Sequence, residues 1–232
     1  MNTEASTITH RQFKDSVYEQ LARVGKAMAA PKRIELLDLL CQAPRTVETL
    51  AELSGISVAN ASQHLKVLRE ARLVTAEKQG LYVEYRVADA QVGLYFHALR
   101  TVAETRLVEL ERITRQHLER HGAPEPVCGE ELLRRVRARE VTVLDVRPLE
   151  EYRAGHIPGA ISVPLPELAK RLAKLPKNRE IVAYCRGPYC IWAVEAVELL
   201  RKKGFRAQRM EFGVLDWRAR GYRVETQKET QA

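Results

Sequence analysis

Two cysteines five residues apart carry the clearest chemical signal in the sequence. Cys185 follows the apolar run 181–184, and Cys190 precedes a segment, 191–203, whose pattern predicts a helix. The residues between the two cysteines are Arg186, Gly187, Pro188 and Tyr189. A cysteine between a buried strand and a helix N-terminus lies in a turn of backbone N–H groups, which favour the thiolate and lower its pKa from about 8.5. We therefore expect Cys185 to be a nucleophile in covalent sulfur transfer.

The role of Cys190 stays open between two readings. It could resolve a persulfide or sulfenate on Cys185 by forming a disulfide, which would make a two-thiol redox switch. Its side chain could equally pack into the following helix. Cys41, after Leu39 and Leu40, is expected in a core, and Cys128 is expected to be an incidental linker thiol. Four cysteines in 232 residues are too few for a disulfide scaffold, so a reducing cytosol is expected.

The elements around this loop alternate between short apolar strands and helices. Strands are expected at 141–144 and 181–184, and helices at 130–139, 165–173 and 191–203. Such alternation predicts an α/β domain with a mainly parallel sheet.

Three motifs in this half resemble the rhodanese domain, over about residues 126–225. They are Val143-Leu-Asp145-Val-Arg147, Tyr152-Arg-Ala-Gly-His156-Ile-Pro-Gly-Ala-Ile161 and the cysteine loop. A closing motif, 210–217, has Phe212 where a second glycine is common in the family. The resemblance implies that Cys185 takes sulfur from a donor such as thiosulfate or a persulfide, with no cofactor. It also implies that Asp145, Arg147 and His156 brace the loop and its strand.

Two alternatives to sulfur transfer fit the sequence less well. Related phosphatases and arsenate reductases use a longer loop ending in an arginine that clamps an oxyanion, but Ile191 stands six residues after Cys185. The domain could also be a catalytically inert sensor surface. The intact Cys185 argues against that alternative.

The N-terminal half has a helical pattern interrupted by one hairpin. Apolar residues recur at three- and four-residue steps over 13–28, and a further helix is expected to begin at Pro31. Thr46 and Ser57 are expected to cap two short helices. The period then changes to two at 73–76 and 82–87, which predicts a β-hairpin. A long helix is expected over 89–120, packed against a second copy of the chain.

Two short helices followed by a hairpin suggest a winged helix-turn-helix. The stretch 57–71, Ser-Val-Ala-Asn-Ala-Ser-Gln-His-Leu-Lys-Val-Leu-Arg-Glu-Ala, closely resembles the recognition segment of the ArsR family of bacterial repressors, within a likeness that covers about residues 16–120. Arg72 departs from the family, which usually has glycine there. A left-handed conformation at this position would cost arginine about 1 kcal/mol. The alternative, a helical oligomerisation domain with a solvated polar face, lacks this motif.

The second helix of this pair is expected to enter the major groove of operator DNA. Its outward residues around Gln63 and His64 are expected to read bases, whereas Lys66 and Arg86 are expected to contact phosphates. The full set of candidate DNA-binding residues is Ser57, Asn60, Ser62, Gln63, His64, Lys66, Arg69 and Arg86.

A metal-sensing role, common among relatives, is not expected. The helix 46–53 has no cysteine pair, and Gln91 stands where the other usual site has a histidine. His117 and His121, spaced four residues apart, could bind zinc across a dimer, but two such histidines more often lie on a solvated surface.

The charge distribution and the composition between the two halves bear on the domain organisation. The formal net charge is +8, but residues 1–121 hold 17 basic and 15 acidic residues, so DNA binding cannot rest on charge alone. The composition of 121–126 predicts a linker, which divides the chain into a winged-helix domain at 1–121, a linker at 122–127 and a rhodanese-like domain at 128–232. The polar N-terminus and the lack of a long apolar run predict a cytoplasmic protein without membrane segments.

The sequence therefore predicts a multidomain protein: a mainly-α winged helix-turn-helix domain followed by an α/β rhodanese-like domain. We interpret it as a homodimeric repressor that binds double-stranded operator DNA and responds to sulfur chemistry at Cys185. The alternatives are a sulfurtransferase whose DNA-binding domain only localises or dimerises it, and a regulator whose rhodanese module is inert.

Overall fold

The computed structural model describes residues 8–122 and 130–227. The chain separates into two compact units, the first taking in Met1–Leu40 and Pro44–Val92, and the second Cys41–Ala43 and Gly93–Ala232. The linker expected at 122–127 lies, apart from Gly122, outside the described residues, as does Cys128. Within the described ranges, no helix is both long and apolar enough to cross a membrane.

The first unit consists of helices and one small antiparallel sheet. Its elements are α1 (His10–Met28), α2 (Pro31–Gln42, whose end belongs to the second unit), β1 (Arg45–Thr46), α3 (Val47–Ser54), α4 (Val58–Glu70), β2 (Val74–Gln79) and β3 (Tyr82–Val87). The caps expected at Thr46 and Ser57 are confirmed, because their hydroxyls accept hydrogen bonds from the backbone N–H groups of Thr49 and Asn60. Gly55, in the left-handed conformation, ends α3 and turns the chain into α4.

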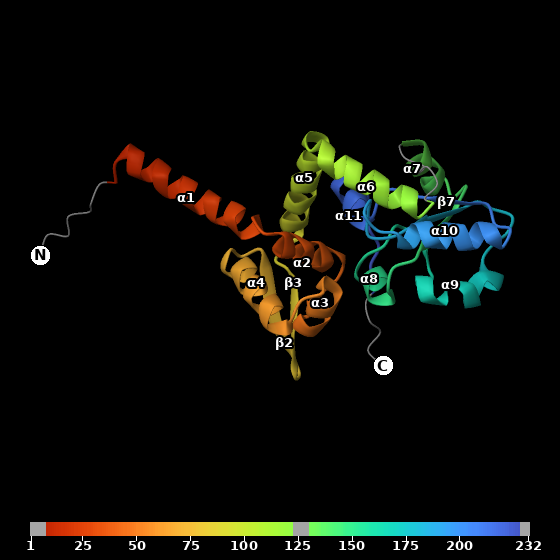
Figure 1. Cartoon of the computed structure of the whole chain (residues 1–232), viewed down its shortest axis with the longest axis horizontal. Coiled ribbons are helices and arrows are strands. Elements are labelled where there is room, and N and C mark those ends of the chain that lie inside the picture. The colour runs from red at the N-terminus through yellow and green to blue at the C-terminus, as the bar shows by residue number, and fades with distance from the viewer. Residues whose placement is uncertain (1–7, 123–129, 228–232) are drawn as a thin grey trace, which may run out of the picture. The chain divides into compact units, whose positions relative to one another are not determined.

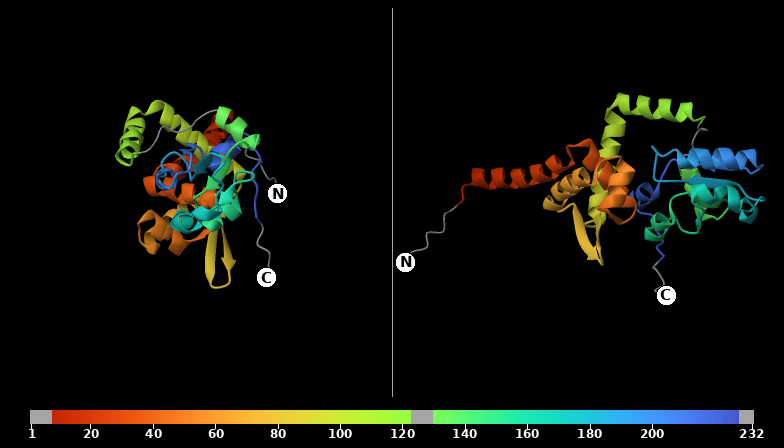
Figure 2. Two further views of the ribbon diagram at one scale, coloured as in Figure 1. Left: turned by 90° about the vertical axis from the view of Figure 1, so that its right-hand side faces the viewer. Right: turned by 60° about the horizontal axis from the view of Figure 1, so that its bottom comes forward.

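The expected hairpin is confirmed, and it carries a third strand. β2 pairs with β3 from Val74 opposite Val87 to Gln79 opposite Tyr82, and β1 pairs with the other edge of β3. β1 has only two residues, too few for an alternating pattern to reveal it. Figure 2 shows the hairpin extending away from the helices α3 and α4, as a wing would.

Arg72 has the left-handed conformation that its position requires, with φ of 60°. The turn after α4 is closed by a hydrogen bond from the N–H of Leu73 to the carbonyl of Leu68, at 2.9 Å. Arginine therefore occupies a backbone site that suits glycine, at a cost of about 1 kcal/mol.

The prediction of one continuous helix over 89–120 is wrong, because the chain forms two helices there. α5 (Ala90–Arg106) ends at Leu107, whose backbone is extended, and α6 (Val108–Arg120) follows. The hydroxyls of Thr101 and Thr105 donate to carbonyls one turn back, which competes with regular helix geometry. Glu109 and Glu111 then lie in the first turn of α6, where the helix dipole favours acidic side chains.

The rest of the second unit contains the expected parallel sheet. Its elements are α7 (Glu130–Arg137), β4 (Thr142–Asp145), α8 (Leu149–Ala154), β5 (Ile161–Ser162), α9 (Leu165–Arg171), a 3-10 turn (Leu172–Lys174), β6 (Ile181–Tyr184), α10 (Trp192–Lys202), β7 (Ala207–Arg209) and α11 (Val214–Ala219). The strand order is β5-β4-β6-β7, with every pair parallel. Figure 1 shows α9 and α10 in this part of the chain.

Helices cover both faces of this sheet. On one face, apolar residues of β4 and β6 pack with α9 and α10; on the other, they pack with α7, α8 and α11. Because neighbouring residues of a strand point to opposite faces, Ala183 and Cys185 share the α10 face, whereas Val182 and Tyr184 point to the opposite face. The cysteine loop, 185–190, therefore begins in a packed core.

Candidate functional site

Cys185 lies where β6 ends and the chain turns toward α10. It is 3% exposed, and its Sγ lies 3.4 Å from the carbonyl oxygen of Cys190. The backbone N–H groups of Gly187 and Ala193 form hydrogen bonds with its sulfur. The loop therefore provides the N–H groups expected from sequence, one of them in the first turn of α10.

Cys190 forms a side-chain hydrogen bond with Cys185, and both are free thiols in this structure. A side-chain hydrogen bond from Cys185 lowers the pKa of Cys190 to about 7. Burial, together with the hydrogen bond and the charge of Cys190, raises the pKa of Cys185 well above its usual range. The expectation of a lowered pKa for Cys185 is therefore wrong for this structure, because burial outweighs the loop amides.

The pair still provides a thiolate near neutral pH. The first proton is lost from Cys190, and the Cys185 S–H donates a hydrogen bond to the resulting thiolate. Transfer of that proton to Cys190 would produce the Cys185 thiolate.

A buried carboxylate holds the loop in place. Glu151 of α8 is fully buried and accepts hydrogen bonds from Arg186, with the Nη2 to Oε1 distance at 2.6 Å and Nε to Oε1 at 3.0 Å. The Arg186 guanidinium also lies over the ring of Trp192, 4.7 Å from its centroid. Arg186 is therefore directed to the scaffold, and Tyr189 is the exposed residue of the loop, at 43%.

Two glycines give the loop its path. Gly187 has φ of 155°, a conformation that side chains disfavour. Gly213 lies against the loop, so closely that a Cβ there would be 2.2 Å from the Arg186 carbonyl oxygen. The closing segment noted in the sequence therefore packs directly on the cysteine loop.

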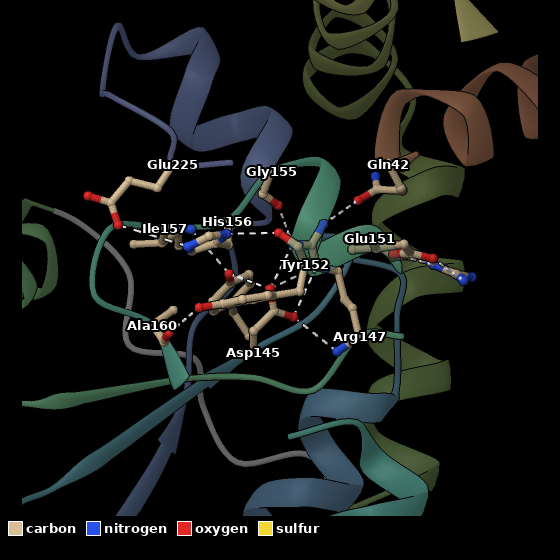
Figure 3. A network of polar contacts seen from close by, with 12 residues as sticks. Gln42, Asp145, Arg147, Glu151, Tyr152, Gly155, His156, Ile157, Ala160 and Glu225 are labelled. Carbon is tan, nitrogen blue, oxygen red and sulfur yellow. Dashed lines mark hydrogen bonds and ion pairs between the residues drawn. The ribbon is translucent and has the colours of Figure 1, made fainter. Parts of the chain in front are cut away.

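A buried polar network anchors β4 and β6 beneath the loop (Figure 3). Asp145 and Arg147 are both fully buried and form an ion pair at 2.7 Å, and the Tyr184 hydroxyl donates to Asp145 at 2.5 Å. Arg147 also donates to the carbonyl of Gly155 at 2.7 Å. Although burial opposes the charge on Arg147, Asp145 more than offsets it, and the pKa of Arg147 is raised.

His156 belongs to the same network rather than to the reacting centre. Its ring stacks on Tyr152 with centroids 3.8 Å apart, and its Nδ1 lies 2.8 Å from the Tyr152 carbonyl oxygen (Figure 3). Its backbone pairs with Glu225. These contacts agree with the bracing role that the resemblance implies for Asp145, Arg147 and His156.

Sequence reasoning missed two residues of this site: Glu151 and Tyr184. Tyr184 had a signal, because it directly precedes the cysteine in a buried strand. Glu151 had none, since an acidic residue in a helix is usual on surfaces.

The candidate DNA-binding residues lie mainly on one exposed side of α4. Ser57 caps the helix, and Asn60, Gln63, Lys66 and Arg69 are exposed, while Ser62 and His64 are half-buried. Ala61, Leu65 and Leu68 fill the opposite side of the helix. This amphipathic arrangement leaves a polar face exposed, as a helix that binds in the major groove of DNA requires.

Arg86 is less available than the residues of α4. It lies on β3, where its guanidinium is 2.6 Å from a carboxylate oxygen of Glu77 and 3.4 Å from one of Glu84. A phosphate would have to compete with these carboxylates. By contrast, the Lys66 side chain is 62% exposed, and its Nζ lies as far as 4.0 Å from the nearest carboxylate oxygen of Glu70.

The two histidines considered for zinc binding and the cysteine expected in a core lie outside the cysteine loop. His117 and His121 are exposed, with ring centroids 4.5 Å apart, and Cys41 is half-buried rather than fully in a core. Among the described residues, no group of three or more His, Cys, Asp or Glu side chains could hold a metal ion.

Comparisons with known proteins agree with both halves of the architecture. Residues 30–76 match the model of the arsR family of bacterial regulatory proteins, and residues 129–220 match that of the rhodanese-like domain. The chain is 44% identical over 213 residues to the HTH-type transcriptional regulator Rv0324 of Mycobacterium tuberculosis, covering 91% of this chain and 93% of that protein.

Two further similarities cover parts of the chain. The putative sulfur carrier protein YrkF of Bacillus subtilis is 36% identical over 78 residues, which is 33% of this chain and 41% of that protein. A solved homodimeric winged helix-turn-helix DNA-binding domain, Mb0332 of Mycobacterium bovis, is 34% identical with a TM-score of 0.40, covering 47% of this chain and 95% of that one.

Proposed function

The chain belongs to the ArsR family of bacterial transcriptional regulators and carries a rhodanese-like domain, and from this we propose that it is a repressor that senses or transfers sulfur through a persulfide on Cys185. The observation that carries the proposal is the hydrogen-bonded pair of free thiols in a loop of backbone N–H groups. A purely structural cysteine has no need of a second thiol beside it.

The chemistry begins with the thiolate of Cys185. Cys190 accepts the proton of Cys185, whose sulfur then attacks the outer sulfur of a donor such as thiosulfate. The S–S bond of the donor breaks, sulfite leaves with the bonding electron pair, and a new S–S bond leaves Cys185 as a persulfide. The loop N–H groups of Gly187 and Ala193 are placed to stabilise its negative charge.

The persulfide is tested by intact mass after treatment with thiosulfate. The wild-type chain should gain about 32 Da, the mass of one sulfur atom, and Cys185→Ser should gain nothing because the nucleophile is absent. Cys190→Ser should still complete this first step, but more slowly at pH 7, because the thiolate that accepts the proton of Cys185 is lost. Cys41→Ser is the matched control and should behave as wild type. A Cys185→Ser chain that still gains sulfur would show that the nucleophile is wrongly assigned.

The DNA-binding half of the proposal rests on α4. Its exposed polar face, capped by Ser57, suits the major groove of double-stranded operator DNA, with the β2–β3 hairpin beside the phosphate backbone. Binding of the full chain to the DNA upstream of its own gene would support a regulator. Sulfur transfer without such binding would favour the alternative, a sulfurtransferase, with which the 36% identity to a putative sulfur carrier agrees.

We further expect a homodimer formed through the helices of the N-terminal half. Phe13, Val17 and Leu21 lie four residues apart along one face of α1, and all three are exposed. Exposed apolar stripes of this kind mark association surfaces. Sedimentation of the wild-type chain should give twice the monomer mass, and Phe13→Asp with Leu21→Asp should reduce that mass to one chain. A monomeric wild-type chain would contradict the expectation.

A further inference from the structure

The helix α5 packs against the segment that supports the cysteine loop. It begins at Ala90 in the first unit, and from Gly93 onward it belongs to the second unit. Gly93 lies so close to α11 that a Cβ there would be 3.3 Å from the Cδ1 atom of Leu215. One continuous helix is therefore shared by the unit that contains α4 and the unit that contains the two thiols.

A buried ion pair joins α5 to the segment before α11. Arg100 of α5 donates to the Oδ1 atom of Asp216, and both side chains are buried. The Oδ2 atom of Asp216 accepts a hydrogen bond from the N–H of Gly213 at 2.9 Å. Gly213 is the residue that lies against the Arg186 carbonyl oxygen of the loop. Because a buried charge that loses its partner is costly, the position of Arg100 depends on the position of Asp216 and hence on the loop.

A second contact ties the exposed part of the loop to the same turn of α5. The Tyr189 hydroxyl donates to the Oε1 atom of Glu104 at 2.7 Å, and that oxygen also lies 3.5 Å from the Nε of Arg100. Residues four apart on a helix lie on one face, so Arg100 and Glu104 form a single contact surface. Two polar contacts therefore connect the loop and its support with one turn of α5.

Persulfide formation on Cys185 changes what the loop must accommodate. The carbonyl oxygens of Cys190 and Gly187 lie 3.4 and 3.9 Å from the Cys185 sulfur, where they can accept its S–H. A persulfide anion offers these oxygens no proton, and it adds an atom at a site that is only 3% exposed. Repulsion between the anion and the carbonyl oxygens, together with the lack of space, requires residues 186–190 to move. Tyr189 and the Arg186 carbonyl belong to this moving segment.

We propose that Arg100 and Glu104 transmit the state of the cysteine loop to α5, so that this turn of the helix couples sulfur on Cys185 to operator binding. The inference rests on the proposed function and names the regulation of the Cys185 site. With free thiols, the two polar contacts hold α5 against the loop. With a persulfide, movement of the loop breaks these contacts, and α5 shifts in the unit that binds DNA.

Operator titrations of the full-length chain test this coupling with two kinds of variant. Glu104→Ala removes the partner of Tyr189, whereas Arg100→Met with Asp216→Asn removes the ion pair and leaves an oxygen to accept the N–H of Gly213. Each variant lacks a contact that the persulfide breaks, so its reduced form should shift toward the affinity of the persulfidated wild-type chain. Treatment with thiosulfate should then change its affinity at most about twofold, against about 5- to 150-fold in the wild type.

The controls separate coupling from folding. Glu198→Ala is the matched control, because that glutamate is exposed on α10, where it pairs with Lys202, and it should respond to thiosulfate as the wild type does. Intact mass verifies the gain of one sulfur atom in every chain that is titrated. Glu104 is 34% exposed, so Glu104→Ala carries the test if the buried double variant does not fold. A wild-type response in Glu104→Ala would overturn the inference.

Hydrogen exchange in α5 tests the same contacts without sulfur transfer. In a chain with Cys41→Ser and Cys128→Ser, iodoacetamide alkylates only the loop thiols, with loss of iodide. Alkylation forces the loop to move, so amide exchange over 97–106 should become at least about 10-fold faster. Exchange over 132–137 of α7, on the other face of the sheet, should not change. With Glu104→Ala added, exchange over 97–106 should be fast before alkylation and change little after it.

The two arms distinguish failure of the inference from failure of the proposed function. Unchanged exchange over 97–106 after alkylation would overturn the inference. If the wild-type chain gains no sulfur, the proposed function fails, and the exchange in α5 alone decides the inference. If the wild-type chain gains sulfur on Cys185 and its operator affinity stays the same, the inference is overturned and the sulfur chemistry stands.

Discussion

The hydrogen bond between Cys185 and Cys190 makes each thiol depend on the other. Removing its donor in Cys185→Ala should raise the pKa of Cys190 from about 7 to the ordinary thiol value of about 8.5 or above, because burial then acts unopposed by that bond. At pH 7, the thiolate fraction of Cys190 and its rate of alkylation should therefore fall. The rate of iodoacetamide labelling at Cys190 against pH, followed by peptide mass spectrometry, gives the midpoint. The control, Cys41→Ala, should keep the midpoint near 7, and an unchanged midpoint in Cys185→Ala would contradict the hydrogen bond.

The chemistry of single residues was only partly predictable from the sequence. Cys185 could be placed in its loop because a strand, a turn and a helix follow one another along the chain. The direction of its pKa shift could not be predicted, since it depends on how deeply the packed sheet buries the sulfur and on the position of Cys190. Tyr189 meets Glu104 only through the packing of α5 on the loop, which no local pattern specifies.

At the scale of elements, the loop depends on the close approach of the segment before α11. Gly213→Ala would place a Cβ 2.2 Å from the Arg186 carbonyl oxygen, so the loop or α11 must shift. We expect a loss of about 1–3 kcal/mol in the free energy of unfolding, and a slower 32 Da gain, because the loop amides move away from Cys185. Chemical denaturation and the rate of persulfide formation measure the two effects. Gly25→Ala is the control, since open space surrounds that position in α1, and unchanged values for Gly213→Ala would contradict the packing argument.

The α4 helix should contact DNA in two distinguishable ways. Lys66→Ala should weaken binding to all sequences alike and reduce the salt slope of the logarithm of affinity by about one, because one phosphate contact is lost. Gln63→Ala should instead change the preference among operator variants, by about 1–3 kcal/mol at one base pair. Fluorescence anisotropy at several salt concentrations separates the two. Lys170→Ala, an exposed lysine of α9, should change neither quantity. Lys66→Ala that affects only one DNA sequence would contradict the assignment.

Elements with local signals were predictable, and those made by tertiary contacts were not. Thr46 and Ser57 cap their helices as expected, since a hydroxyl and the N–H three residues later are sufficient for a cap. β1 and β5, of two residues each, exist only because neighbouring strands pair with them. The break at Leu107 had no proline or glycine to announce it.

At the scale of the whole molecule, one chain joins a thiol pair to a DNA-binding helix. Such a chain regulates only if sulfur on Cys185 changes the free energy of operator binding. By linkage, the change in the free energy of operator binding equals the difference in the free energy of modification between free and DNA-bound protein. A persulfide adds one sulfur atom to a buried loop and moves the negative charge of the thiol pair from Cys190 to the outer sulfur on Cys185, so two conformations of the chain need not tolerate it equally.

We therefore expect persulfide formation to change operator affinity about 5- to 150-fold, the range typical of coupling free energies of 1–3 kcal/mol. Release of DNA is the expected direction for a repressor. Reduced and persulfidated chains are titrated with operator DNA at one salt concentration, because salt alone changes affinity greatly. Cys185→Ser treated with the same donor should show no change. Cys190→Ser should still respond if the persulfide is the signal, and should fail to respond if a Cys185–Cys190 disulfide is required. Identical curves for wild-type chains whose persulfide is verified by mass would show that the two halves share a chain without energetic coupling.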